Sequence, residues 1–385
     1  MTLRRRGAVF PAEGVREGVL DFIKRALGKN CFDAVLIPAK MPGSDSFPYL
    51  LIQDESLLEN AHPLPPVMSV QGARAISSLT GRGKGKKRIA ALVRPCELRA
   101  TVELFKLGQV DLENIFLISI DCPGALPLTE WAKNPKKTED EFSQILKGEA
   151  SESLRPICQI CDKFSTTGAE DLHIGTLGVK AGSILLTPNS PKGKAILDCI
   201  GVSAEADISG WQSQVDTLTA ERKEKREQAH KELESRATGL NNLLNTFSKC
   251  INCHNCMRVC PICYCQQCFF DSNDMKFAFD DYLERAKVTG GLRLPPETLF
   301  FHIGRMLHMS LSCVSCGACE DACPTAIPVA QVFSLIGNKN HEEFDYVPGR
   351  NLDESLPLRK YEEEEFEEVE QSYVETSAKQ ETRDV

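Results

Sequence analysis

Two cysteine runs in the C-terminal third of this 385-residue chain share the same spacing and the same final proline. The pattern Cys-x2-Cys-x2-Cys-x3-Cys-Pro occurs in residues 250–261 and again in residues 313–324. Three thiolates spaced in this way lie on one tight loop and hold three irons of a cubane, while the fourth lies beyond a short helix. The repeated pattern therefore predicts two [4Fe-4S] clusters.

The spacing also predicts which cysteines share a cluster. In chains with two such runs, the fourth cysteine of each run ligates the cluster of the other run. The first expected set is Cys250, Cys253, Cys256 and Cys323, and the second is Cys313, Cys316, Cys319 and Cys260. Zinc is the plainer alternative, because Cys-x2-Cys pairs also bind zinc. The third cysteine and the Cys-Pro ending, both present twice, favour iron–sulfur clusters.

Three more cysteines follow the first run directly. Cys263, Cys265 and Cys268 form a Cys-x-Cys-x2-Cys pattern. They are candidates for a further cluster, for exchange with one of the eight assigned thiolates, or for a reactive dithiol. These alternatives stay open, because a cluster needs a fourth ligand and the nearby candidate is His254. A histidine of this kind more often lies at the surface without binding a metal.

Four cysteines in the N-terminal half are candidates for a third [4Fe-4S] cluster. Cys96 and Cys122 each follow a predicted strand, so parallel strands would bring both to the carboxyl edge of a sheet, where open α/β sheets hold ligands. Cys158 and Cys161 form a Cys-x2-Cys pair. Cys96 has the alternative of being an ordinary buried thiol. For Cys199 we expect a free thiol in the core.

The elements that must position these cysteines follow from the apolar pattern. Strands are expected in residues 31–39, 49–53, 88–95 and 115–121, and helices in residues 15–28, 69–80 and 96–108. This alternation predicts an α/β domain, to which we assign residues 1–205. Residues 206–248 are rich in Glu-to-basic pairs four apart, which predicts a charged, solvent-exposed linker helix. An α-helical, ferredoxin-like domain with two clusters is expected in residues 249–350.

Composition limits the classes of function. The chain has 42% hydrophobic residues, a net charge of −9, no apolar run long enough for a membrane span and no signal-peptide pattern, so we expect a cytoplasmic protein. Seventeen cysteines in such a chain indicate metal ligation rather than disulfides, and clusters of this type suggest an anaerobic cell. The basic residues form no stripe for nucleic acid. The acidic tail, residues 351–385, is expected to be disordered.

Three segments carry a resemblance to a known family. These are CQICDKFSTTGAEDLHIGTLG at residues 158–178, LVRPCELRA at residues 92–100, and the stretch from the second cysteine run to FDYVPGR at residues 344–350. Together they resemble the beta subunits of coenzyme F-420-reducing hydrogenases and F-420-dependent formate dehydrogenases, the last segment being similar to the ferredoxin extension of the formate dehydrogenase members.

The resemblance implies an FAD in the α/β domain beside its cluster, exchanging a hydride with a soluble carrier. Candidate FAD contacts are Arg82 and Lys84 in a glycine-rich basic loop, and Thr176 and Gly178 in the IGTLG turn. The basic loop has a plainer alternative as a solvated loop, because a dinucleotide fingerprint would follow a strand and open a helix. No residue selects F-420 over a nicotinamide.

The hypothesis from the sequence is an iron–sulfur flavoprotein subunit of an anaerobic oxidoreductase complex. It would pass electrons between a hydride carrier and a catalytic partner such as a formate dehydrogenase, a hydrogenase or a heterodisulfide-reductase-like flavoprotein. The chain has no molybdenum or nickel–iron signature, so formate or hydrogen chemistry would belong to another chain. The alternative is a pure electron-transfer adaptor with no carrier site of its own.

Overall fold

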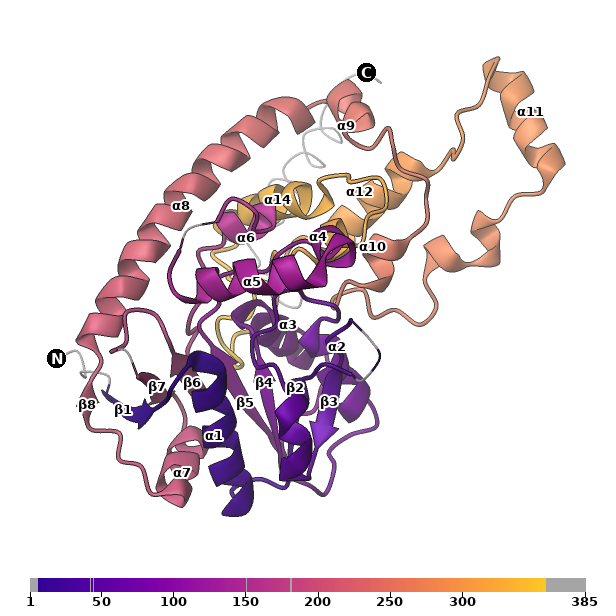
Figure 1. Cartoon of the computed structure of the whole chain (residues 1–385). Helices are drawn as coiled ribbons and strands as arrows, with labels where there is room; N and C mark the ends of the chain where they lie inside the picture. The colour runs from indigo at the N-terminus through magenta and orange to yellow at the C-terminus, as the bar shows by residue number, and fades with distance from the viewer. Residues whose placement is uncertain (1–5, 42, 44, 150, 181, 358–385) are drawn as a thin grey trace, which may run out of the picture. The chain divides into compact units, whose positions relative to one another are not determined.

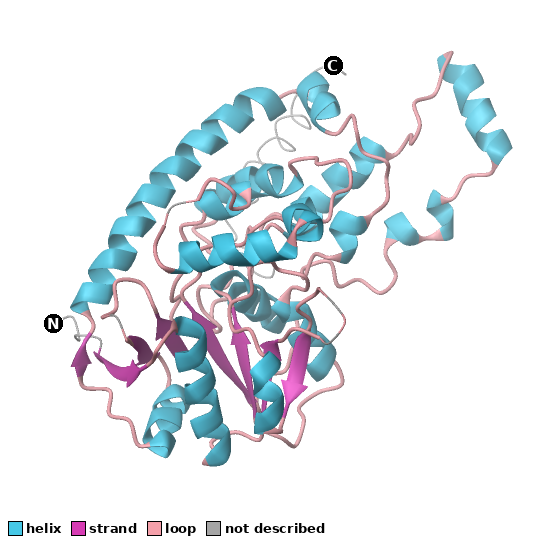
Figure 2. Cartoon of the chain, viewed as in Figure 1, coloured by secondary structure: helices cyan, strands magenta, loops and turns pink. Residues whose placement is uncertain are grey.

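A mixed β-sheet organises the N-terminal half of the chain (Figures 1 and 2). The computed structural model describes residues 6–41, 43, 45–149, 151–180 and 182–357. The strands are β1 (Arg6–Pro11), β2 (Ala34–Pro38), β3 (Tyr49–Ile52), β4 (Ile89–Val93), β5 (Ile115–Ile120), β6 (Leu172–Gly175), β7 (Ser183–Pro188) and β8 (Ala206–Asp207). Their order is β3-β2-β4-β5-β6-β7-β1-β8, in which β2, β4, β5 and β6 are mutually parallel.

Helices cover both faces of this sheet. On one face α1 (Val15–Gly28) and α7 (Pro191–Ile200) share a core with Leu92 and Ile118. On the other face α2 (Gly72–Thr80) and α3 (Pro95–Lys106) share a core with Ala91 and Leu117. Parallel strands covered on both faces are mostly apolar, which explains the unbroken apolar run of β4 and the nearly unbroken run of β5.

The expected strands coincide with β2, β3, β4 and β5, and the expected helices with α1, α2 and α3. Four short strands, β1, β6, β7 and β8, were not expected as parts of one sheet. The apolar pattern does not reveal β6, because its second residue is His173, which is fully buried and has polar partners. A polar residue in a buried strand breaks the apolar run from which such strands are recognised.

The remaining elements are helical. They are η1 (Glu55–Asn60), α4 (Leu128–Lys133), α5 (Pro135–Leu146), α6 (Pro156–Gln159), α8 (Ser209–Ala237), α9 (Leu240–Thr246), α10 (Asn255–Arg258), η2 (Phe269–Asp271), η3 (Asn273–Met275), α11 (Phe279–Thr289), α12 (Thr298–Met309), α13 (Ala318–Asp321) and α14 (Val329–Glu343). Figure 1 shows α8 running from the sheet to the cysteine-rich half. The expected charged helix is thus α8 followed by α9, with a break at Gly239, whose φ is +87°.

α8 is not exposed on all sides. His230 and Leu233 are buried, and the imidazole of His230 lies 3.2 Å from the hydroxyl of Ser334 on α14. The helix therefore packs against the cysteine-rich half along its second part. Its role as a linker between domains stays a prediction, because residues up to Leu352 form one compact unit.

One expectation about the cysteines is wrong. Cys199 is not a free core thiol but forms a disulfide with Cys31, and the other fifteen cysteines are free. Cys31 follows α1 and Cys199 lies in the last turn of α7, two helices that pack side by side. The two residues are 168 positions apart, so their pairing depends on helix packing and has no spacing signal in the sequence.

Residues 358–385 of the acidic tail lie outside the described residues, and the disorder expected there stays a prediction. Across the described parts of the chain, no helix combines the length and the apolar character needed to cross a membrane.

The segment after α14 is tied back onto α3. Tyr346 donates its hydroxyl hydrogen to Oε1 of Glu103 at 2.5 Å, and the backbone N–H of Gly349 donates to the same oxygen at 2.8 Å. Glu103 is fully buried, so these bonds satisfy one oxygen of a carboxylate that is costly to bury. Lys106, 3.5 Å from the same oxygen, adds a buried positive charge.

Substitution of Gly349 tests this strap. Gly349 has a φ of +76°, and a Cβ there would collide with the backbone of Arg99. Gly290 has a φ of +75° but open space around it, so Gly290→Ala measures the backbone strain alone. We expect Gly349→Ala to lower the free energy of unfolding by about 1–3 kcal/mol more than Gly290→Ala does, because of the added collision. Thermal and denaturant unfolding followed by circular dichroism measure both. Equal losses would contradict the close packing described here.

Candidate iron–sulfur sites and an adjoining cavity

The carboxyl edge of the sheet gathers the four cysteines of the N-terminal half. β4 and β5 are parallel with Val93 opposite Ser119, so Cys96, at the start of α3, and Cys122, just after β5, leave the sheet side by side. Burial raises the pKa of Cys96 well above its usual value, and the charges of Glu97, Cys122 and Cys161 raise it further. Burial likewise raises the pKa of Cys161, with a further contribution from Cys158 on α6.

We call these four cysteines the sheet-edge set. They come together as the sequence predicted, and their ligation of a cluster stays a prediction.

Two buried arginines contact the sheet-edge set. Nη1 of Arg94 donates to the sulfur of Cys122 at 3.1 Å and to the carbonyl oxygen of Gly124 at 2.8 Å. Nη2 of Arg155 lies 3.3 Å from the sulfur of Cys158. Positive charge at this position suits a cluster, whose thiolate ligands are negatively charged.

A buried carboxylate fixes the backbone beside Cys122. Asp121 is fully buried; its Oδ1 lies 2.9 Å from Nε2 of His173, and its Oδ2 accepts hydrogen bonds from Nε1 of Trp211 at 2.8 Å and from the backbone N–H of Thr176 at 2.7 Å. Burial opposes ionisation, but the contacts with His173 hold the pKa of Asp121 below its usual value. Asp121 thereby joins β5, β6 and the first turn of α8. One local signal marks this residue in the sequence, because it is acidic and directly follows a buried strand.

We call Cys250, Cys253, Cys256 and Cys323 the first ferredoxin set. It lies where α10 and α13 meet. Burial raises the pKa of Cys256 to about 11; Arg305 opposes this rise, and the charges of Cys250, Cys253 and Cys323 add to it. Cys323 belongs to the second run of the sequence. Its charge acts on Cys256 of the first run, which agrees with the crossover expected from the spacing; the ligation itself stays a prediction.

We call Cys313, Cys316, Cys319 and Cys260 the second ferredoxin set. Its member from the other run is Cys260. Burial raises the pKa of Cys319 well above its usual value, and the charges of Cys260, Cys316 and Cys313 contribute to the increase. For Cys316 burial raises the pKa to about 12, again with contributions from Cys260 and Cys313. Cys260, the last cysteine of the first run, thus lies among the cysteines of the second run.

The three sets form a continuous series. The charge of Cys316 also raises the pKa of Cys96, whose rise is mainly due to burial, so the second ferredoxin set lies next to the sheet-edge set. Nη1 of Arg305 donates to the sulfur of Cys256 at 3.1 Å, and the charges of Cys260 and Cys319 also act on this guanidinium. The order is therefore sheet-edge set, second ferredoxin set, first ferredoxin set.

Unsatisfied donors around the thiols test whether clusters fit. Nε of Arg155 and Nε of Arg305 are buried and have no hydrogen-bond partner among the described residues, and neither has Nδ1 of His302, whose other nitrogen lies 3.3 Å from the sulfur of Cys250. Buried donors without acceptors are costly, and the sulfur atoms of a cluster accept hydrogen bonds of this kind. The residues present therefore fit clusters at these places.

The geometry differs from that of a single metal ion. Within the described ranges, no three His, Cys, Asp or Glu side chains converge closely enough to hold one ion. A cubane makes a different demand, because each of its four thiolates binds a different iron. The sulfur atoms of one set need not meet at a point.

Cys263, Cys265 and Cys268 do not come together in this way. The sulfur of Cys263 lies 2.7 Å from the sulfur of Met309, that of Cys268 lies 3.7 Å from the sulfur of Met257, and Cys265 is exposed. A hydrogen bond from Cys263 lowers the pKa of Cys260 to about 6. The alternatives for these three cysteines therefore stay open: a further cluster, an exchange with one of the eight assigned thiolates, or a reactive dithiol.

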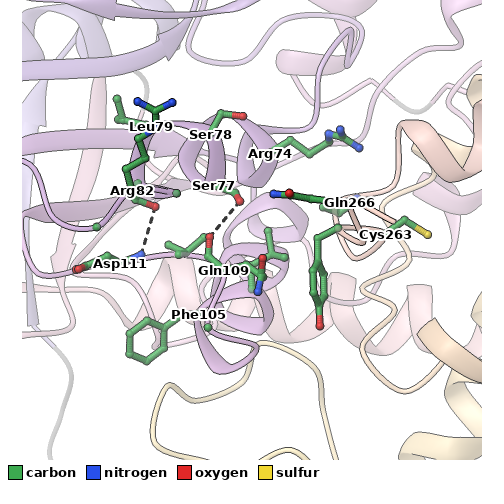
Figure 3. A pocket seen from close by; sticks show the side chains of 18 residues that line it. Arg74, Ser77, Ser78, Leu79, Arg82, Phe105, Gln109, Asp111, Cys263 and Gln266 are labelled. Carbon is green, nitrogen blue, oxygen red and sulfur yellow. Dashed lines mark hydrogen bonds between the residues drawn. The ribbon is translucent and has the colours of Figure 1, made fainter. Parts of the chain in front are cut away.

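A cavity of about 1000 Å³ lies between the helices α2 and α3 and the segment that follows the first cysteine run (Figure 3). Arg82, Ser77 and Phe105 line it from the α/β side, and Cys263 and Gln266 line it from the other side. Lys84, the other basic candidate, is not among the lining residues and forms an exposed ion pair with Glu113 at 2.7 Å. The volume is at the upper end of the range for ligand pockets.

The four candidate FAD contacts fall at opposite edges of the sheet. Arg82 and Lys84 precede β4 and so lie near its amino end, whereas Thr176 and Gly178 follow β6 at the carboxyl edge. The backbone N–H of Thr176 is already bonded to Asp121. The structure does not bring the two pairs together.

Comparison with known proteins adds independent evidence. Residues 246–327 match the family model of the 4Fe-4S dicluster domain. The F-420-dependent formate dehydrogenase subunit beta of Methanocaldococcus jannaschii is 26% identical over 88% of this chain and 92% of its own length. The F-420-dependent formate dehydrogenase 1 subunit beta of Methanococcus maripaludis is 29% identical over 88% of this chain and 91% of its own length.

Among solved structures, a chain of the F-420-reducing [NiFe] hydrogenase complex from Methanosarcina barkeri, studied by xenon derivatization, matches 62% of this chain and 95% of its own length. Its TM-score is 0.44 at 12% identity, which is too low to support an argument about the fold.

The two-cluster domain predicted from the cysteine spacing is confirmed by the family match over residues 246–327. The resemblance inferred from the sequence is also confirmed: over 88% of its length this chain is similar in sequence to beta subunits of F-420-dependent formate dehydrogenases.

Proposed function

We propose that this chain is the iron–sulfur flavoprotein subunit of an oxidoreductase complex, and that it carries electrons between a hydride carrier and a catalytic partner chain. The observation that supports this most is the continuous series of three cysteine sets, in which Arg155 contacts both Cys158 and the backbone of Cys316 and Arg305 contacts Cys256. Electrons move efficiently only between neighbouring centres, so a series of this kind serves transport through the protein. The names of the homologues agree with a subunit that works beside other chains.

The chain's own residues would hold three [4Fe-4S] clusters through the sheet-edge set and the two ferredoxin sets. The clusters would supply one-electron transfer, and the protein would tune it by hydrogen bonds to sulfur and by burial. Arg94, Arg155, His302 and Arg305 are the side chains that donate to, or lie against, ligand sulfurs. Each is in place to stabilise negative charge.

An FAD is proposed in the cavity lined by Arg82. A flavin would convert a hydride into single electrons, and the chain would contribute a positive charge for the phosphates and hydroxyl groups such as that of Ser78. Cys263 and Pro261, the residue after Cys260, line this cavity, so the proposed second ferredoxin cluster would lie near its wall. The turn with Thr176 and Gly178 is the other candidate position.

The carrier is proposed to be F-420 or a similar soluble hydride carrier, with a nicotinamide as the competing choice. The partner is proposed to be a formate dehydrogenase or hydrogenase type of catalytic subunit, or a heterodisulfide-reductase-like flavoprotein. The second candidate function, an adaptor that carries electrons without its own flavin, is favoured by the exposed position of the cavity residue Arg82. Flavin content separates the two.

Flavin content and carrier reduction are therefore the first test. Protein purified without oxygen is expected to hold about one FAD per chain, and its flavin absorbance should bleach on adding reduced F-420 or a reduced nicotinamide. Arg82→Glu should lower FAD occupancy about tenfold or more, because it reverses the charge that faces the phosphates. Lys84→Glu, outside the cavity, is the matched control. A wild-type protein without flavin would support the adaptor function instead. If Gly178→Val loses FAD and Arg82→Glu does not, the FAD site lies at the carboxyl edge of the sheet.

Substitution of Cys316 tests the second ferredoxin set. Cys316→Ser is expected to remove about four of roughly twelve irons per chain and to interrupt electron flow, while flavin remains bound. Iron analysis and electron paramagnetic resonance of the reduced protein measure the loss. An unchanged iron content would refute the assignment of Cys316 as a ligand.

The sheet-edge set has its own test. Cys122→Ser should remove about four irons and leave the signals of the two ferredoxin clusters in place. Cys265→Ser, at an exposed cysteine outside the three sets, should change neither iron content nor spectrum. Equal iron in Cys122→Ser and wild type would limit the chain to two clusters.

A further inference from the structure

Arg155 lies at the junction between the sheet-edge set and the second ferredoxin set. It precedes α6 and is 5% exposed. Its Nη2 lies 3.3 Å from the sulfur of Cys158 and donates to the backbone carbonyl oxygen of Cys316 at 3.1 Å. One guanidinium therefore contacts a thiol of one set and the backbone of a proposed ligand of the other, 161 residues away in the sequence.

The surroundings of this guanidinium leave its charge only partly compensated. Nη1 lies 3.5 Å from Oδ2 of Asp321, which is longer than a strong charged hydrogen bond. Among the described residues, neither Nη1 nor Nε has a hydrogen-bond partner. The other oxygen of Asp321 accepts from the backbone N–H of Leu128 at 2.9 Å. Both side chains of the ion pair are nearly inaccessible, so solvent screens the charge of Arg155 weakly.

The second cysteine run is shaped to approach this charge. Gly317 has a φ of +79°, and a Cβ there would press against Ile157 and lie 3.4 Å from Cζ of Arg155. A glycine directly after Cys316 thus lets the ligand loop lie against the guanidinium. A larger residue would move the loop away.

We propose that Arg155 is a positioning residue for electron transfer that stabilises the reduced forms of both clusters at this junction. Adding an electron makes a cluster more negative, so a fixed buried cation beside it raises its reduction potential. Because Arg155 lies against both sets, it raises both potentials together, so both clusters accept electrons at the junction between the two halves of the chain. Asp321 acts in the opposite direction by offsetting part of the cation.

Arg305 offers a matched comparison one junction further along. It is 2% exposed, and its Nη1 and Nη2 donate to the sulfur and the carbonyl oxygen of Cys256, both at 3.1 Å. It is also close to Cys260 and Cys319. A substitution there removes the same charge from the same kind of site but leaves the sheet-edge set untouched.

The inference rests on the proposed clusters, and redox titration of the full-length holoprotein followed by electron paramagnetic resonance tests it. At a fixed potential, Arg155→Gln is expected to lower the ratio of reduced to oxidised cluster about tenfold in the sheet-edge and second ferredoxin clusters, with little change in the first. Arg155→Lys, which keeps the charge, should stay much closer to wild type. Arg305→Gln should shift the two ferredoxin clusters and spare the sheet-edge cluster.

Asp321→Asn separates an effect of charge on the clusters from an effect of the substitution on the fold. The asparagine oxygen can still accept from Leu128, and loss of the negative charge should raise the reduced fraction of the same two clusters. This shift is opposite in sign to that of Arg155→Gln, which a purely structural role would not produce.

The outcomes separate the two proposals. Fewer than three clusters in the wild type would overturn the proposed function. Three clusters in the wild type with unchanged potentials in Arg155→Gln would overturn the role of Arg155. If Arg155→Gln loses iron, Asp321→Asn decides: a raised reduced fraction supports the inference, and an unchanged or lowered one refutes it.

Discussion

Burial of many thiols beside one another is the constraint on which the rest of this structure depends. A thiolate taken out of water is costly unless a positive charge or a hydrogen-bond donor accompanies it. Four arginines meet this demand, Arg94, Arg99, Arg155 and Arg305, each 5% exposed or less. Arg94 follows β4, Arg99 lies on α3, Arg155 precedes α6 and Arg305 lies on α12. The charge balance of the cysteine sets therefore depends on both halves of the chain.

The same constraint explains why the two halves form one compact unit. Arg155 contacts the backbone of Cys316, and Arg99 donates to the carbonyl oxygen of Val314, so two α/β arginines satisfy carbonyl groups of the second cysteine run. Tyr346 and Gly349 then return the chain to Glu103 on α3. These polar contacts are buried, and breaking them would leave charges without partners. A movable ferredoxin arm on a flexible linker would not need them.

The positions of the three cysteine sets and of the cavity within this unit define the proposed route of the electrons. The sheet-edge set belongs to the α/β half, the first ferredoxin set lies at the far end of the series, and the cavity with Arg82 opens beside Cys263 near its middle. Asp121, joined to His173, Trp211 and Thr176, keeps the backbone beside Cys122 fixed in this series.

The sequence by itself determined the chemistry of the cysteine runs and the central strands. Ligand spacing within residues 250–261 and 313–324 is local, and so is the apolar pattern of β4 and β5, so both could be predicted without tertiary information. The tertiary structure alone decided which charges lie between the sets, because Arg155 and Cys316 meet across 161 residues. It also decided the Cys31–Cys199 disulfide and separated Arg82 from Thr176. Contacts between distant segments depend on how whole helices and strands pack, and the pattern of residues near either partner carries no trace of them.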